Sequence, residues 1–181
     1  MLDDAITDRK YSPAEGRGRT KHDELAQAKR TLMLKLLDLP PIWLIVFLAL
    51  ARIQAQRLQI GPSGTPLTDF IGGMLAGGGV LVIIIAVRQM VQVRTTIIPH
   101  RDPEELVSGG IFRYSRNPIY LGDAMILTGL ILYWGAWPSL VLVPLFVWLI
   151  TDRFVVDEEA RLQAAFSDRF DSYRRQVRRW I

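Results

Sequence analysis

Residues 68–87 of the chain read TDFIGGMLAGGGVLVIIIAV, and this run decides the fold class. It carries one charged side chain, Asp69 near its beginning, and it is long enough to cross the hydrocarbon core of a bilayer as a helix. Its glycines include small residues four apart, a spacing that lets helix backbones approach closely in lipid. We therefore interpret the glycines as packing residues of a membrane span rather than as the lining of a ligand groove.

Three further apolar runs predict spans at about residues 41–58, 119–137 and 139–156, with Arg52 as the weak point of the first. The last two are separated by YWGAWP, residues 133–138, so we expect them to form a tight helical hairpin. Trp43, Trp134 and Trp137 fall at predicted span ends, where indole rings prefer the headgroup level. The sequence thus predicts an all-α, polytopic integral membrane protein with about four transmembrane helices.

Polar or amphipathic segments flank the predicted spans. Residues 1–20 have the mixed composition of a disordered tail, and residues 21–38 place leucines on one helical face with basic residues nearby, which is typical of an interfacial helix. Residues 157–178 repeat apolar side chains at helical spacing and predict a second amphipathic helix. We expect residues 39–181 to form a single membrane domain, with a cytoplasmic loop at residues 88–118.

The charge distribution orients the predicted spans. The long polar segments carry most lysines and arginines, whereas the connection after the first span has few and the turn at residues 133–138 has none. The positive-inside rule then places both ends in the cytoplasm, as expected for a bacterial inner-membrane protein. The arginines behind the net charge of +4 flank apolar runs, which fits an anionic lipid leaflet better than nucleic acid. Because the chain has no cysteine, disulfides and thiolate sites are excluded, and we expect no metal.

The segment LVSGGIFRYSRNPIYLG, residues 106–122, is richer in special residues than a plain loop. Gly109 and Gly110 permit a backbone that leaves amide groups free to meet a ligand, and Arg116 lies at the mouth of the third span. The hairpin would return Glu158 and Glu159 to the same membrane face. The structural alternative is that Arg116 only extends to the interface and that the glutamates favour a helix beginning.

This ordered combination resembles the isoprenylcysteine carboxyl methyltransferases and their relatives, which include the membrane phospholipid methyltransferases. The resemblance covers about residues 95–181 and rests on RNPIYLG at residues 116–122, the hairpin, and Glu158-Glu159 followed by the apolar positions of the last helix. It implies a membrane enzyme that takes its methyl group from S-adenosylmethionine, held in a pocket closed by the polar loop and the tail. Asn117 stands where many members have a histidine, which puts proton transfer at that position in doubt.

Residue chemistry agrees with what the resemblance implies. The donor's carboxylate and ammonium match Arg116 and one of the two glutamates, which project about 100° apart on a helix, so that one serves the site and the other pairs structurally. The expected catalytic residues are Arg116, Asn117 and Glu159. The expected donor-binding residues are His100, Leu106, Val107, Gly110, Ile111, Tyr114, Arg116, Asn117, Tyr120, Glu158 and Glu159.

The methyl acceptor stays open at this point, between a prenylcysteine carboxylate, a lipid amine, a small thiol and a phenol-like group, all entering from the lipid. A carboxylate acceptor is already ionised and needs no base, whereas a thiol or ammonium needs a titrating group, and His100 is the histidine near the motif. The role of Asp123 is equally open: its carboxylate is either functional or bonded to a neighbouring arginine or to the headgroup zone. The rival to an enzyme is a non-catalytic membrane scaffold or small-ligand binding protein on the same frame.

Overall fold

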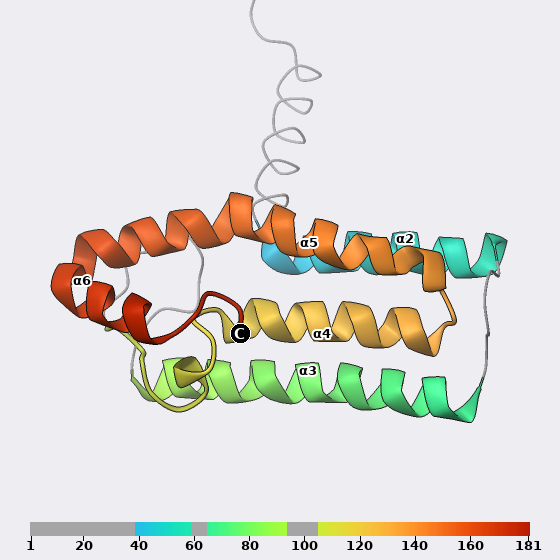
Figure 1. Ribbon diagram of the computed structural model, residues 1–181, viewed down its shortest axis with the longest axis horizontal. Coiled ribbons are helices and arrows are strands. Elements are labelled where there is room, and N and C mark those ends of the chain that lie inside the picture. The colour runs from blue at the N-terminus through green and yellow to red at the C-terminus, as the bar shows by residue number, and fades with distance from the viewer. Residues whose placement is uncertain (1–38, 59–64, 94–104) are drawn as a thin grey trace, which may run out of the picture. The chain divides into compact units, whose positions relative to one another are not determined.

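Prolines open the three long helices that precede the hairpin turn in the computed structural model, which describes residues 39–58, 65–93 and 105–181. These are α2 (Pro40–Arg57), α3 (Pro66–Gln92) and α4 (Pro118–Tyr133) (Figure 1). Each has proline in its first turn, where no amide hydrogen is needed. The remaining elements are η1 (Gly110–Arg113), η2 (Trp137–Val141), α5 (Leu142–Ile150), η3 (Thr151–Val155) and α6 (Val156–Gln176). The described part of the chain contains helices and no strand, as the sequence predicts. The predicted tail at residues 1–20, the predicted interfacial helix at residues 21–38 and His100 lie outside the described residues.

Helices α3 and α4 pack through glycines that lie two turns apart on each helix. A Cβ on Gly72 would lie 2.6 Å from the carbonyl oxygen of Gly129, and a Cβ on Gly79 would lie 2.5 Å from that of Gly122. Gly77, in contrast, has nothing within 4 Å of such a Cβ. The packing interpretation therefore holds for the glycines that face α4. Gly73 and Gly77, which lie four residues apart, are not among them.

The connection from α4 to α5 is as tight as the sequence predicts. Gly135 adopts a φ of +63°, which glycine tolerates without strain. Its amide donates to the carbonyl of Leu132 at 3.0 Å, and the amide of Ala136 donates to that of Ile131 at 2.9 Å. These two bonds form the Schellman motif, which satisfies the last carbonyls of α4 and turns the chain into η2.

Two helical stretches are long and apolar enough to cross a membrane, namely α3 and the run Trp137–Gln176 that joins η2, α5, η3 and α6. In the most apolar stretch of α3 only 17% of the residues are buried, so side chains such as Leu67, Phe70 and Met74 are exposed. An apolar surface of this extent fits contact with lipid tails. Helix α4 is apolar but shorter, and crossing by α2 and α4 stays a prediction.

Helix α3 runs to Gln92, five residues beyond the expected span end at Val87. Arg88, Gln89 and Met90 are good helix formers, so polarity here does not end the helix. The first residues of the expected loop at 88–118 are therefore helical. This extension brings Gln89 to residues 106–117, called the polar segment here.

The apolar core lies where α2, α4 and α5 meet. The rings of Phe47 and Phe146 pack edge to face with centroids 5.4 Å apart, and Leu127 and Ile150 are fully buried beside them. Arg52, the weak point of the first predicted span, has its guanidinium 5.4 Å from the centroid of the Trp134 ring. This cation–π contact gives the charge a partner at the span's end.

Candidate active site

The polar segment is anchored to the end of α3 by Gln89. The side-chain oxygen of Gln89 accepts a hydrogen bond from the amide of Ile111 at 3.1 Å. Gly110 has a φ of +54°, a backbone conformation that favours glycine, and a Cβ there would displace the Gln89 side chain from this hydrogen bond. The amide of Ile111, expected to be free for a ligand, is thus engaged within the protein.

Residues 177–181, called the return segment here, lie across the end of the polar segment. The backbone amide of Arg116 donates to the carbonyl of Arg178 at 3.1 Å. The carbonyl of Arg179 accepts both the side-chain amide of Asn117 at 3.0 Å and the hydroxyl of Ser115 at 3.2 Å. Asn117 is 8% exposed, and its side chain therefore holds the return segment through a bond that needs a donor and no titrating group.

A reversal inside α6 brings the return segment back. Ser167 has φ 36° and ψ −107°, which breaks the helix, and the chain folds back on itself after this residue (Figure 1). Beyond the reversal Phe170 and Tyr173 are buried, and the Tyr173 hydroxyl donates to the carbonyl of Phe112 at 2.6 Å. Burial raises the pKa of the Tyr173 phenol above its ordinary value. The second half of α6 is thereby fixed against the polar segment.

Glu159 lies between Arg116 and Arg179, and these three residues are called the charged cluster here. Its carboxylate is 3.0 Å from Nη2 of Arg116 and accepts two bonds from the guanidinium of Arg179, with Nε at 3.1 Å. The Arg116 and Glu159 side chains are only 10% and 12% exposed. Burial lowers the pKa of Arg116, an effect that Glu159 opposes, whereas the hydrogen bond to Glu159 raises the pKa of Arg179. The sequence predicts a role for Arg116 and Glu159 and gives no signal for Arg179.

Arg116 retains unused hydrogen-bonding capacity. Within the described residues its Nε and Nη1 atoms are buried and have no hydrogen-bond partner. Buried donors are nearly always satisfied, and leaving one unpaired costs about 1 to 3 kcal/mol. A guanidinium in this state is poised to bind a further anion, such as a carboxylate.

Glu158 takes a different partner from its neighbour. Its carboxylate accepts a hydrogen bond from the hydroxyl of Tyr120 at 2.9 Å, and Tyr120 is 6% exposed. The two glutamates thus engage different elements, as their angular separation on a helix predicts.

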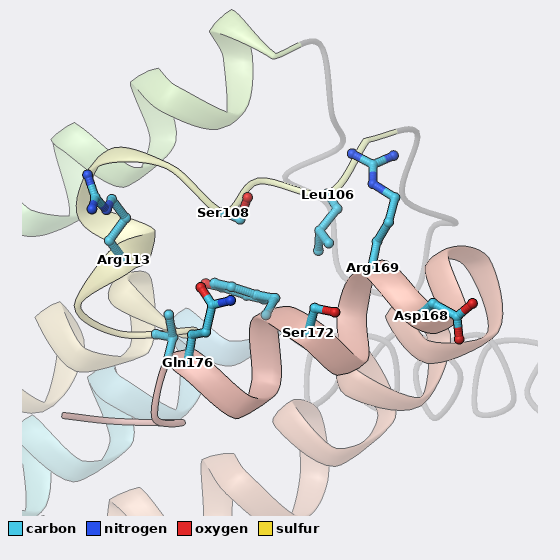
Figure 2. Close-up of a pocket in the computed structure, with 9 residues that line it drawn as sticks. Leu106, Ser108, Arg113, Asp168, Arg169, Ser172 and Gln176 are labelled. Carbon is cyan, nitrogen blue, oxygen red and sulfur yellow. The ribbon is translucent and has the colours of Figure 1, made fainter.

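A pocket of about 620 Å³ opens between the polar segment and the end of α6. Figure 2 shows Leu106 and Ser108 on one side facing Ser172 and Gln176 on the other. The lining residues are Leu106, Ser108, Arg113, Asp168, Arg169, Ser172, Tyr173, Gln176 and Val177. Arg116 does not line the pocket but is close enough to Tyr173, which does, to interact with it electrostatically.

The remaining expected donor-binding residues are dispersed. Leu106 is the one that lines the pocket. Val107 and Ile111 pack on an apolar cluster formed by the polar segment and the ends of α3 and α6. Tyr114 is 79% exposed and contributes to neither the pocket nor the charged cluster.

Comparison with known proteins identifies the family. The family model described as phospholipid methyltransferase matches residues 67–169, which is more than half of the chain and includes both glutamates. The Schizosaccharomyces pombe protein named Protein-S-isoprenylcysteine O-methyltransferase is 33% identical over 72 residues, which make up 40% of this chain and 30% of that relative. The match thus spans less than a third of the relative's length, and no solved structure matches the chain. These findings confirm the resemblance seen in the sequence, and the chain belongs to the phospholipid methyltransferase family.

Proposed function

We propose that this protein transfers a methyl group from S-adenosylmethionine to a lipophilic or amphiphilic acceptor at the cytoplasmic face of a membrane. The observation that carries the proposal is Arg116, a buried guanidinium with two unpaired nitrogens beside Glu159. Family membership supports the reaction type, because the matched region includes Arg116, Asn117 and both glutamates.

The amino-acid end of the donor fits the charged cluster. Its carboxylate would satisfy the Nε and Nη1 hydrogens that have no partner among the described residues. Glu159 is already engaged by two guanidinium groups, so we assign it to orienting Arg116. The carboxylate of Glu158, bonded to the neutral phenol of Tyr120, is our choice for the donor's ammonium.

The nucleoside end would occupy the neighbouring pocket. Its volume of about 620 Å³ falls in the range of roughly 300 to 1,000 Å³ that small-molecule sites occupy. Tyr173, Leu106 and Val177 offer apolar surface, and Ser108, Ser172 and Gln176 offer polar groups that would fix an orientation. Tyr173 lines the pocket and lies near Arg116, so we place the two ends of the donor in adjoining parts of one site.

S-adenosylmethionine supplies the methyl group from its sulfonium centre. The chain's own residues have to hold the reacting atoms in line and keep water out, and both tasks suit a rigid, largely buried site. Arg116 and Glu158 would hold the donor, while Asn117 fixes the return segment that carries Arg179. No observation in the described residues favours the non-catalytic scaffold.

Calorimetry with S-adenosylhomocysteine in detergent tests the proposal. Wild type should bind, and Arg116→Ala should weaken binding more than tenfold, because losing a buried charge-assisted contact costs roughly 2 to 5 kcal/mol. Arg57→Ala, at the exposed end of α2, is the matched control and should bind as wild type. A wild-type protein that does not bind the ligand would overturn the proposal. If wild type binds the ligand, mass spectrometry of lipid extracts and small thiols incubated with the protein and labelled donor would identify the acceptor.

A further inference from the structure

Asp123 is a buried carboxyl that the proposed donor site does not use. It lies in α4 between Gly122 and Ala124 and is 7% exposed. It follows Tyr120 by three residues, so the two side chains are neighbours on the helix surface, and they interact electrostatically. Asp123 therefore lies one turn deeper in the apolar part of the molecule than the Tyr120–Glu158 hydrogen bond.

Within the described residues Asp123 makes no hydrogen bond and no ion pair. The charged groups around Tyr120 are Glu158 and Arg161 of α6, and no charged side chain of the described parts of α2, α3 or α5 offsets the burial of Asp123. Aspartate is also a weak helix former, and an unpaired carboxyl is costly in an apolar segment. Neither packing nor helix stability accounts for this residue, which leaves a role toward a ligand.

We propose that Asp123 is a catalytic residue that takes the proton from the acceptor, and that the acceptor's nucleophilic atom is therefore an N–H or S–H group. This inference rests on the proposed methyl transfer. Asp123 is a neighbour of Tyr120, whose hydroxyl is bonded to Glu158, the residue that we assign to the donor's ammonium. An acceptor that enters from the lipid beside α4 would therefore meet the bound donor near Asp123.

The methyl transfer moves one proton and one electron pair. The ammonium form of an amine, or a thiol, gives its proton to the Asp123 carboxylate, and the electron pair left on nitrogen or sulfur forms the bond to the methyl carbon of the donor. The bond between that carbon and sulfur breaks, its electron pair stays on sulfur, and S-adenosylhomocysteine is released. Loss of the proton to water returns Asp123 to its carboxylate form.

The same residue disfavours carboxylate acceptors. A carboxylate is already ionised and needs no base, and it would be repelled by Asp123 and by Glu158, which is bonded to the adjacent Tyr120. Asp123 would thus act both in proton removal and in selection of the acceptor.

The test uses three lipophilic probes in detergent: dodecylamine, dodecanethiol and an N-acetylated farnesylcysteine, which offers a carboxylate. We expect methyl transfer to the amine or the thiol, and the comparison of the two shows which atom is the acceptor. Asp123→Asn should lower kcat for that probe more than about 100-fold, the scale of general base catalysis, with unchanged affinity for S-adenosylhomocysteine. Asp152→Asn, an exposed acid on η3, is the control and should match wild type.

Two results would overturn the role of Asp123. One is an Asp123→Asn protein that binds S-adenosylhomocysteine and transfers methyl groups at the wild-type rate. The other needs no variant: donor-bound wild type that methylates the carboxylate probe alone, or none of the three, contradicts the inferred acceptor. Failure of the proposed function looks different, because wild type would then not bind S-adenosylhomocysteine at all.

Discussion

The side-chain amide of Asn117 and the backbone carbonyl of Arg179, 62 residues apart in sequence, form a hydrogen bond of 3.0 Å. The histidine that the family resemblance leads one to expect at this position could make the same bond. The contact needs an N–H donor of the right reach, which asparagine and histidine both supply. Asn117 thus acts on the site by holding the return segment, and Arg179 of that segment engages Glu159.

Asn117→His should retain methyl transfer, whereas Asn117→Leu, similar in size but without a donor, should lose most of it. The leucine variant leaves the Arg179 carbonyl with one donor fewer, and a lost buried hydrogen bond costs about 1 to 3 kcal/mol. Initial rates and S-adenosylhomocysteine affinity measure the effect. Equal rates for wild type and the leucine variant would show that the bond to the return segment is dispensable.

The glycine packing of α3 and α4 gives a matched pair of variants. Gly79→Ala should destabilise the protein by about 1 to 3 kcal/mol, because the added Cβ would lie 2.5 Å from the Gly122 carbonyl oxygen and force the helices apart. Gly77→Ala adds the same methyl group where nothing lies within 4 Å and should be neutral or stabilising by up to about 1 kcal/mol. Thermal unfolding in detergent compares them. Equal melting temperatures would rule out close packing at Gly79.

The buried phenol of Tyr173 predicts a loss of stability in alkaline solution. Its pKa is raised above the ordinary value of 10.0 in the folded protein, so as the pH passes about 10 the unfolded state releases this proton before the folded state does. The contribution is complete below pH 10 and is lost as the pH rises further. Tyr173→Phe should lower stability at pH 8, because the bond to Phe112 is lost, and should show a smaller further loss between pH 8 and 11. An unchanged pH dependence would contradict burial of the phenol.

The proposed topology has four crossings with both ends of the chain in the cytoplasm. Since the chain has no cysteine, single cysteines at Ser63 and Ser172 can be labelled without background. A reagent that does not cross membranes should reach position 63 only from the outer side and position 172 only from the cytoplasmic side. Labelling of both from the same side would mean that α3 and the α4–α5 hairpin do not have the predicted orientation.

Local sequence signals predicted much of the helical frame. The turn at residues 133–138 was predictable because Gly135 and Pro138 punctuate two apolar runs, and the packing role of the glycines followed from their size. Which glycines face α4 was not predictable, because that depends on the register between two helices. Polarity alone predicts the end of α3 five residues too early, because Arg88 and Gln89 are polar but are good helix formers.

The candidate site was only partly predictable for a similar reason. Arg116, Glu158 and Glu159 stand out by type and position, and the structure brings Arg116 and Glu159 together. Arg179 reaches Glu159 only because the chain reverses at Ser167, where the sequence has neither glycine nor proline to indicate a break. The pocket depends on the same reversal, since five of its lining residues come from the part of α6 after Ser167, namely Asp168, Arg169, Ser172, Tyr173 and Gln176.

The bond between Asn117 and Arg179 can form only late in the synthesis of the protein. Asn117 leaves the ribosome 62 residues ahead of its partner, and the α4–α5 hairpin is made in between. At roughly 5 to 20 residues per second, the nascent chain spends seconds with Arg116 in place and Arg179 still to be translated. The ion pairs that join Arg116, Glu159 and Arg179 can therefore be complete only after the α4–α5 hairpin has been made.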